Sequence, residues 1–143
     1  MSKLLGAHQT MTIWNKYRND GLDAWQRHIV PDCTWRKTSI KTISASGIAN
    51  IADYIVVLIS DNKSYMTFDD WKLLSDDGKK YFFTIQTGDL VALGKYSIEI
   101  LLDSPYREIE VKELLKPDVI NIKSFRVNNF DHMLGKHIKL EGV

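Results

Sequence analysis

Alternating side chains constrain this chain more than any other feature of its sequence. Apolar β-branched or aromatic residues recur at every second position in short runs, and turn-forming residues separate the runs. Such alternation is typical of strands, and closely spaced runs favour antiparallel pairing. The predicted strands cover about residues 11–17, 24–30, 35–43, 55–59, 81–85, 90–93, 119–127 and 136–141. At least seven strands in 143 residues predict an all-β fold, mainly an antiparallel β-barrel or sandwich.

Turn residues set where these strands end. Asn19-Asp20-Gly21 predicts a turn after the first strand, and Pro31-Asp32 breaks or bends the chain after the second. The uninterrupted apolar run Ile55–Ile59 predicts a strand that is buried on both faces. The last two strands pair most simply as a terminal hairpin around Asn128-Asn129-Phe130-Asp131.

Helical patterns are scarce, and we expect one or two short helices. Phe68–Leu74 has apolar residues at helical spacing and follows Thr67, which with Asp70 resembles a weak capping box. We expect Asp76-Asp77-Gly78 to end this helix. Glu110–Lys116 is the second candidate, and Pro117 halts it because proline disfavours helix in the residue before it.

Length and composition indicate one domain. The chain has 143 residues and a net charge of +1, without a repeat or an interdomain linker, so we expect residues 1–143 to form one domain with residues 1–10 as an extended N-terminal arm. Its one cysteine, Cys33, excludes an intrachain disulfide. The sequence has neither a signal-like start nor an apolar run long enough for a membrane span, so we expect a soluble intracellular protein without membrane contacts.

A search for catalytic motifs finds none of the common ones. The sequence lacks a Walker loop, Gly-x-Gly-x-x-Gly, Gly-x-Ser-x-Gly and His-Glu-x-x-His, so we expect neither an enzyme nor a cofactor. His132 and His137 flank the last predicted hairpin but supply only two imidazoles, and zinc usually needs a third protein ligand. Cys33 and His28 are close in sequence, yet nothing indicates an activated thiolate. We therefore interpret both as structural residues.

One stretch of the chain is distinctly basic. No acidic residue occurs from Cys33 to Ala52, whereas Arg36, Lys37 and Lys41 do. A solvated strand face and a sequence-blind phosphate contact both explain this pattern. The four tryptophans, Trp14, Trp25, Trp35 and Trp71, favour one core cluster, with a stacking platform for single-stranded nucleic acid as the alternative.

Short motifs along nearly the whole chain resemble one group of proteins. They are Thr12–Tyr17, Asp23–Arg27, Trp35, Gly47, Ala52-Asp53, Trp71–Ser75, Phe83–Val91, Glu113–Lys116, Ile120–Ser124 and His137–Gly142. In this order they resemble small head-to-tail connector proteins encoded between the capsid and tail genes of tailed phages and prophages of Gram-positive bacteria. The chain departs from the pattern in two places: the expected Ile-Pro does not follow Ile55–Ile59, and Pro31-Asp32 interrupts the segment that leads to Trp35.

The resemblance implies a structural protein of the virion neck. A β-barrel in that module is most similar to the stopper, or head-closure, protein, which forms a ring that retains packaged DNA and docks the tail. Its implied partners are copies of itself in a six-fold ring, connector proteins on the adaptor or portal side and on the tail side, and double-stranded DNA bound without sequence preference. Assembly would take place in the bacterial cytoplasm. Tail-terminator and tail-completion ring proteins are alternatives, and a small-molecule-binding or enzymatic β-barrel is the alternative from another class.

The ring hypothesis nominates two sets of residues. We expect Arg36, Lys37 and Lys41 to lie on a loop that faces the DNA channel, because they are the basic residues of the stretch without acids. The terminal hairpin is the candidate surface for a neighbouring subunit, with Ile122, Phe125, Ile138 and Leu140 as its apolar residues.

Overall fold

The first hairpin follows directly from its turn sequence. The computed structural model describes residues 8–43, 45, 47, 49–128 and 136–143, with the backbone alone at 40–43 and 49–52. β1 (Gln9–Asn19) and β2 (Leu22–Ile43) are joined by Asp20 and Gly21, whose φ angles are 52° and 78°. Two successive positive φ angles make the tight turn that matches strand twist, and Asp-Gly adopts it readily. The predicted turn is confirmed.

β2 is a single strand of 22 residues, where the sequence predicts two. Cys33 pairs with Gln9 and Val30 pairs with Met11, so β2 has one more residue than β1 between these pairs. The extra residue forms a β-bulge at Pro31-Asp32, with Asp32 at a φ of 59°. The bulge bends the strand and lets pairing continue beyond it, so the prediction of two separate strands is wrong.

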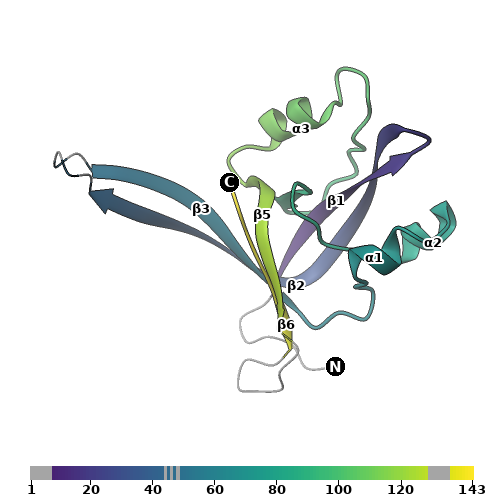
Figure 1. Cartoon of the computed structure of the whole chain (residues 1–143), viewed down its shortest axis with the longest axis horizontal. Coiled ribbons are helices and arrows are strands. Elements are labelled where there is room, and N and C mark those ends of the chain that lie inside the picture. The colour runs from purple at the N-terminus through teal and green to yellow at the C-terminus, as the bar shows by residue number, and fades with distance from the viewer. Residues whose placement is uncertain (1–7, 44, 46, 48, 129–135) are drawn as a thin grey trace.

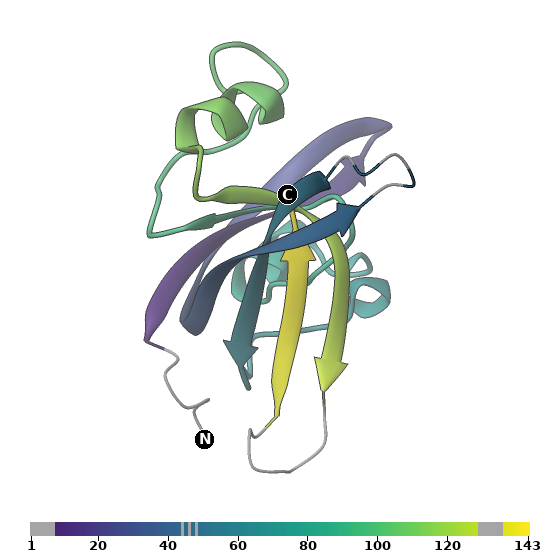
Figure 2. The same ribbon diagram turned by 90° about the vertical axis from the view of Figure 1, so that its left-hand side faces the viewer.

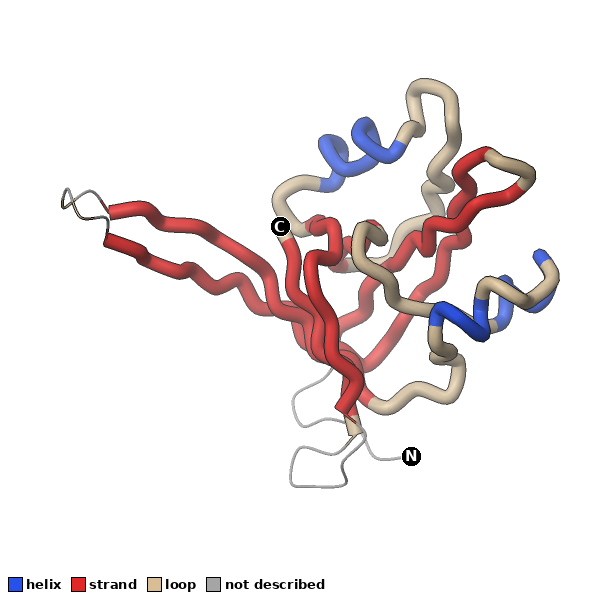
Figure 3. The backbone as a smooth tube through the Cα atoms, viewed as in Figure 1, coloured by secondary structure: helices blue, strands red, loops and turns tan. Residues whose placement is uncertain are grey.

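β3 (Ala49–Ser60) runs back along β2 as a long antiparallel ribbon. β1 pairs with β2 only up to Cys33, and β6 (His137–Gly142) pairs with β3 only from Ile55 onward. Beyond these points the two strands pair only with each other, and Figures 1 and 3 show the ribbon leaving the rest of the sheet. We call residues 36–43 and 49–54 the arm.

The remaining strands close the sheet. β4 (Leu90–Leu93) pairs with β1 and with β5 (Val119–Asn128), and β5 pairs with β6. The closed order is β1-β2-β3-β6-β5-β4, which confirms the predicted all-β antiparallel barrel (Figure 2). The terminal hairpin is also confirmed, although Asn129, Phe130 and Asp131 of its predicted loop lie outside the described residues. Of the predicted N-terminal arm, residues 9 and 10 belong to β1 and residues 1–7 lie outside the described part.

Three short helices lie between β3 and β5, and one of them occupies a segment where the sequence predicts a turn. α1 (Phe68–Trp71) confirms the first candidate over a shorter range, and α3 (Glu108–Leu115) confirms the second. Between them, α2 (Asp76–Tyr81) begins where we expected α1 to end, because the Ser75 hydroxyl accepts a hydrogen bond from the Gly78 N–H at 3.2 Å. None of these described helices has the length and apolar character needed to cross a membrane.

Two further predictions about strands are wrong. Tyr81 belongs to α2, and within residues 81–85 Phe83 forms only an isolated bridge with Tyr65. The described residues therefore form six strands. The strand through Ile55–Ile59 is not buried on both faces, since Val56 and Leu58 are half-buried while their neighbours point into the barrel.

Side chains pack on both faces of the barrel wall. The interior is filled by a cluster that includes Met11, Phe83 and Leu140, all at most 2% exposed. A second cluster lies under α3 and contains Trp14, Leu90 and Val111. Residues 11–15 of β1 are buried on both faces because this part of the strand lies between the two clusters.

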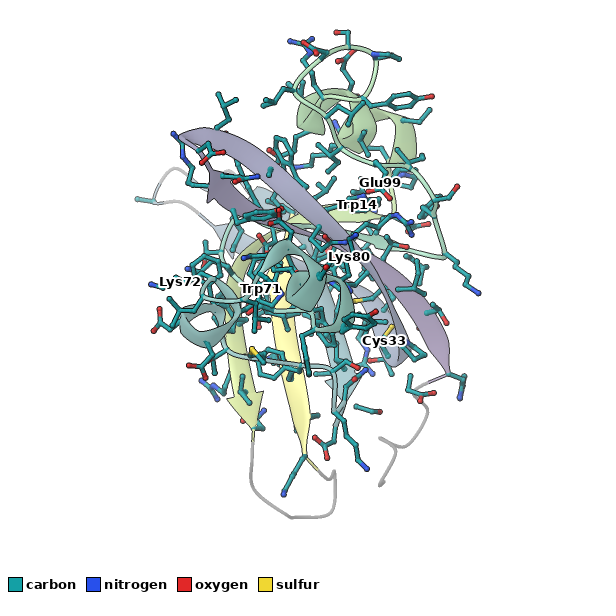
Figure 4. All side chains as sticks on the ribbon, turned by 90° about the vertical axis from the view of Figure 1, so that its right-hand side faces the viewer. Trp14, Cys33, Trp71, Lys72, Lys80 and Glu99 are labelled. Carbon is teal, nitrogen blue, oxygen red and sulfur yellow. The ribbon has the colours of Figure 1, made fainter. Side chains whose placement is uncertain are left out.

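The tryptophans do not form the one cluster that the sequence favours. Trp35 packs against the interior cluster, whereas Trp14 and Trp25 belong to the cluster under α3. Trp71 is buried elsewhere, with Tyr17 edge-on at 5.4 Å between ring centroids. Figure 4 shows Trp14 and Trp71 in separate parts of the molecule.

Candidate assembly surfaces

The arm carries the three basic residues that the sequence nominates, on strands instead of the expected loop. Arg36 pairs with Val56 and Lys37 pairs with Ile55. Successive residues of a strand point to opposite faces, so Arg36 and Lys37 lie on different faces of the ribbon. Ile55 points into the barrel, which places Lys37 on the inner face and Arg36 on the outer face. Lys41 pairs with Ile51 further out, and its side chain lies outside the described part.

The inner face of the arm carries a small polar cluster. Lys37 Nζ lies 3.7 Å from Asp53 Oδ2, and the Ser39 hydroxyl donates to Asp53 Oδ1 at 2.5 Å. Both partners of this ion pair are more than half exposed, so the pair adds little to stability. Arg36 is also exposed, and no ion pair joins it to another described residue. Among the described side chains of the arm, Arg36 is therefore the cation without an ion-pair partner.

The backbone edges of the arm are also open. Among the described residues, no third strand pairs with β2 beyond Cys33 or with β3 before Ile55. Open strand edges offer unpaired N–H and C=O groups to other chains, and monomeric proteins usually cover or interrupt them. The arm therefore leaves both of its backbone edges unpaired within the described part of the chain.

The predicted neighbour surface on the terminal hairpin needs correction. Ile122, Ile138 and Leu140 belong to the interior cluster and are 0, 4 and 0% exposed. Only Phe125 of the four nominated residues is exposed, at 37%. Alternation identifies an apolar face but does not say whether that face meets the protein's own core or another chain. Here it meets the core.

A groove opens at the base of the arm, and sequence reasoning missed it. Its volume is about 450 Å³, and we call it the basal groove. It is lined by Lys37, Asp53, Tyr54 and Ile55 of the arm base, Lys112, Lys116 and Pro117 at the end of α3, Val119 and Ile120 of β5, and Gly142 and Val143. Segments distant in sequence build it, so only the closed barrel brings these residues together.

Lysines dominate the charge around the basal groove. Lys112 Nζ donates to Asn121 Oδ1 at 2.6 Å and to the Val143 carbonyl at 3.2 Å. Partial burial, followed by repulsion from the nearby Lys116 and Lys123, lowers the pKa of Lys112. Lys116 forms an ion pair with Glu113 at 2.7 Å. The lining of the groove therefore combines apolar side chains with three lysines and one carboxylate, Asp53.

A second missed feature is the loop that precedes α3. Leu101 and Leu102 are each 50% exposed and Tyr106 is 42% exposed. The Leu101 N–H donates to the Tyr106 carbonyl at 2.8 Å, and the Tyr106 N–H donates to the Asp103 carbonyl at 3.2 Å, so the loop folds back on itself. We call residues 101–106 the knob. Its signal in the sequence is the Leu101-Leu102 pair directly before the turn-forming Asp103-Ser104-Pro105.

A buried carboxylate ties the chain before β4 to β1. Asp89 is 2% exposed, and it accepts hydrogen bonds from Asn15 Nδ2 at 2.9 Å, the Lys16 N–H at 3.0 Å and the Gln86 N–H at 3.1 Å. Burial raises its pKa to about 7 even though all three hydrogen bonds favour the ionised form. Asn15 also donates to the Thr84 carbonyl and accepts from the Thr84 N–H. Because these groups are hydrogen-bonded to one another, the network holds the segment before β4 against β1.

The Cys33 thiol and the His28 imidazole are the groups that could support nucleophilic chemistry. Cys33 is fully buried and donates to the Gln9 carbonyl at 3.3 Å, and burial raises its pKa to about 12. The His28 ring lies 6.4 Å from the Phe83 ring between centroids, and burial lowers its pKa. A thiol held in its neutral form is a poor nucleophile. This geometry agrees with the structural interpretation of both residues.

Metal-ligating side chains do not gather in the part of the chain that the structure describes. No three histidine, cysteine, aspartate or glutamate residues approach closely enough there to hold a metal ion. His137 is buried and its Nε2 lies 3.0 Å from Asn128 Nδ2. His132 lies outside the described residues, so the pair that the sequence suggested is not tested.

Comparison with known proteins gives a single result. Neither curated proteins nor solved structures match the chain. Residues 7–143 match a family described as a family of unknown function, DUF6751. Because this match extends over nearly the whole sequence, the chain belongs to the DUF6751 family.

Proposed function

We propose that this protein is a ring-forming structural subunit of the head-to-tail connector of a tailed phage, of the stopper or head-closure type. The observation that carries the proposal is the arm, a β-ribbon that leaves the barrel and has both backbone edges open. The sequence resemblance to connector proteins supplies the biological setting. The barrel acts as the body, and the arm reaches neighbouring subunits or the DNA.

The physical argument for assembly concerns the cost of exposing such an arm. Ordering a residue costs about 1–2 kcal/mol of backbone entropy, which burial normally offsets. Residues 36–39 and 53–54 of the arm are exposed or half-buried. A long exposed ribbon with open edges also invites aggregation. A partner that covers the arm in the assembled state would offset this entropy cost and pair the open edges.

The outer face of the arm supports a DNA contact. Arg36 is exposed there, and the arm segment 36–54 holds three basic residues and one acidic residue. In a ring this charge is repeated in every copy around the channel. Repeated cations neutralise phosphates without reading bases, which suits retention of any packaged sequence.

No comparable observation among the described residues supports the alternative of a ligand-binding or enzymatic barrel. Small barrels hold a ligand in the interior when side chains leave room for it. Here the interior is filled by Met11, Phe83, Ile120, Leu140 and their neighbours. Among ring proteins, the position in the particle distinguishes a stopper from a tail-terminator or tail-completion protein.

Electron microscopy of particles tests the proposal. A tagged copy is expressed in cells that produce phage particles from the prophage carrying this gene, and the tag is located with gold-labelled antibody. We expect label at the neck of DNA-filled heads. Particles without the chain, or label confined to the tail tip or the capsid shell, would contradict the proposal. Label at the junction of a free tail identifies the tail-terminator alternative.

A charge-reversed variant tests the DNA contact separately. Arg36, Lys37 and Lys41 are changed together to Glu, and the fraction of heads that keep their DNA is counted. We expect empty heads to predominate while the purified variant keeps its fold. DNA retention equal to that of the wild type would remove the channel contact from the proposal. The same reversals at Lys63, Lys72 and Lys80, which lie outside the arm, form the matched control.

A further inference from the structure

We propose that the knob of one subunit binds the basal groove of the next subunit, so that copies of this chain associate head to tail. This inference rests on the proposed function for its biological role and names the contact between copies. Its physical basis is independent of phage particles, because both surfaces are present on the single chain.

The knob has the composition of a contact surface. Leu101, Leu102 and Tyr106 are 42–50% exposed within six residues, and Ile109 in the first turn of α3 is 66% exposed. Contiguous exposed apolar side chains with a polar surround mark interaction sites on soluble proteins. The fold does not use these side chains, since none belongs to either core cluster.

Charge complementarity favours the basal groove as the partner of the knob. Between residues 99 and 110 the chain has four carboxylates and one guanidinium. Asp103, at the tip, is exposed and forms no ion pair with another described residue. The groove is lined by Lys37, Lys112 and Lys116 and by one carboxylate, Asp53, which pairs with Lys37 at 3.7 Å, so its side chains carry a net positive charge beside apolar residues. The knob is apolar and acidic, and the basal groove of another copy is apolar and basic, so the two surfaces are complementary.

The placement of the two surfaces suits a repeating contact. The groove adjoins Lys112 in α3 and Lys116 just after its last residue, whereas the knob lies just before its first residue, Glu108. Figures 1 and 2 show the arm and the loop before α3 projecting in different directions. Two different complementary surfaces on one subunit form a heterologous contact, which continues from copy to copy and closes into a ring at a fixed rotation.

Cysteine cross-linking between two variants tests the contact directly. One variant carries Leu102→Cys in the knob and the other carries Val143→Cys in the groove, and the two are mixed and mildly oxidised. We expect the mixed disulfide to form in clear excess over either self-linked dimer, because only the mixture brings knob and groove together. Wild-type protein provides the background, since Cys33 is buried and its high pKa keeps it unreactive.

Each outcome of the cross-linking experiment either supports or overturns the inference. Self-linked Leu102→Cys or Val143→Cys dimers in equal yield would indicate a symmetric contact or random collision and would overturn the inference. Absence of any mixed disulfide at concentrations near 1 mM, with both variants folded by circular dichroism, would also overturn it. A mixed disulfide together with absence of the chain from phage particles would keep the contact and reject the proposed function.

Charge exchange provides a second measurement that needs no cysteine. Asp103→Lys and Lys116→Glu are each expected to weaken self-association by about threefold, since a rim ion pair is worth little. In the mixture the knob of each variant meets the groove of the other with opposite charges at positions 103 and 116, so the mixture should associate more tightly than either variant alone. Lys80→Glu, an exposed lysine on α2, is the matched control and should leave association unchanged. If the mixture associates no better than the separate variants, the two charges do not meet.

Discussion

The two halves of β2 have the same secondary structure and very different surroundings. From Leu22 to Cys33 the strand pairs with β1, and Trp25 packs against the cluster under α3 while Val30 enters the barrel interior. From Thr34 to Ile43 it pairs only with β3, and its outer half forms the arm. One continuous strand therefore links a region held by packing to an arm that lies outside both core clusters.

This comparison distinguishes the barrel, whose packing stabilises the fold, from the arm, which lies outside that packing. Burial of apolar side chains supplies most of the free energy of folding, so the barrel should be stable without the arm. The arm should in turn be dispensable for stability and needed for assembly. The predictions below test this division, beginning with the change that should cost the most stability.

Leu140→Ala should have the largest effect. Leu140 is fully buried in the barrel interior, and its loss leaves a cavity that the surrounding strands only partly fill. We expect the free energy of unfolding to fall by about 2–5 kcal/mol, measured by urea denaturation. A loss below 0.5 kcal/mol would mean that Leu140 belongs to a surface, as the sequence pattern suggested, and not to the core. Leu73→Ala, at an 80% exposed position, is the control.

Asp89→Asn should rank second. The amide places an NH₂ group among the three N–H donors of Asn15, Lys16 and Gln86, so at least one donor loses its acceptor. At pH 9, above the pKa of about 7, Asp89 is ionised and accepts from all three donors, so we expect a loss of about 1–3 kcal/mol in the free energy of unfolding. Asp69→Asn, an exposed aspartate in α1, should change stability by less than about 0.5 kcal/mol. Equal losses in the two variants would show that the Asp89 hydrogen bonds do not stabilise the contact between this segment and β1.

The same carboxylate makes wild-type stability depend on pH. Its pKa is about 7 in the folded protein against 3.8 for an ordinary aspartate, so the folded state holds a proton that the unfolded state has released. The stabilisation is complete below pH 3.8 and is lost as the pH rises to about 7, with a slope of at most about 1.4 kcal/mol per pH unit. Denaturation curves of Asp89→Asn should lack this component. A wild-type profile parallel to that of the variant between pH 4 and 7 would show that Asp89 is ionised throughout.

Shortening the arm should have a smaller effect on stability. Thr38 and Tyr54 are paired, so an Asn-Gly turn can join them in place of residues 39–53. We expect the free energy of unfolding to change by less than about 1 kcal/mol, because the removed residues lie beyond both core clusters. Assembly into particles should be lost. A large drop in stability would contradict the division between barrel and arm.

Local pattern was sufficient for most strands of the barrel. The runs at residues 11–17 and 119–127 and the turn at Asp20-Gly21 are confirmed, because alternation and turn chemistry act over a few residues. The bulge at Pro31-Asp32 was not predictable in detail, since it depends on pairing with β1. The sequence predicts a turn where α2 lies, because Asp and Gly are common in turns. The side-chain cap at Ser75 favours the helix instead.

The candidate surfaces were harder to predict than the fold. Apolar alternation nominated Ile122 and Leu140 as neighbour contacts, yet closure of the barrel buries them. The basal groove joins the arm, the end of α3 and the C-terminal strand, so it exists only after closure. Charge alone correctly drew attention to Arg36 and Lys37 as exposed residues, but the strand places them on opposite faces.

This separation of Arg36 from Lys37 gives the last and smallest expected effect on stability. Arg36→Glu and Lys37→Glu should each change the free energy of unfolding by less than about 0.5 kcal/mol, since both side chains are exposed. Their functional effects should differ. Arg36→Glu on the outer face should reduce DNA retention, whereas Lys37→Glu in the basal groove should weaken the contact between copies. Counting DNA-filled heads and measuring the mixed disulfide for both variants compares the two directly. If each variant impaired both measurements equally, the faces of the arm would not be divided between DNA and neighbour, and the channel and the subunit contact would have to share one surface.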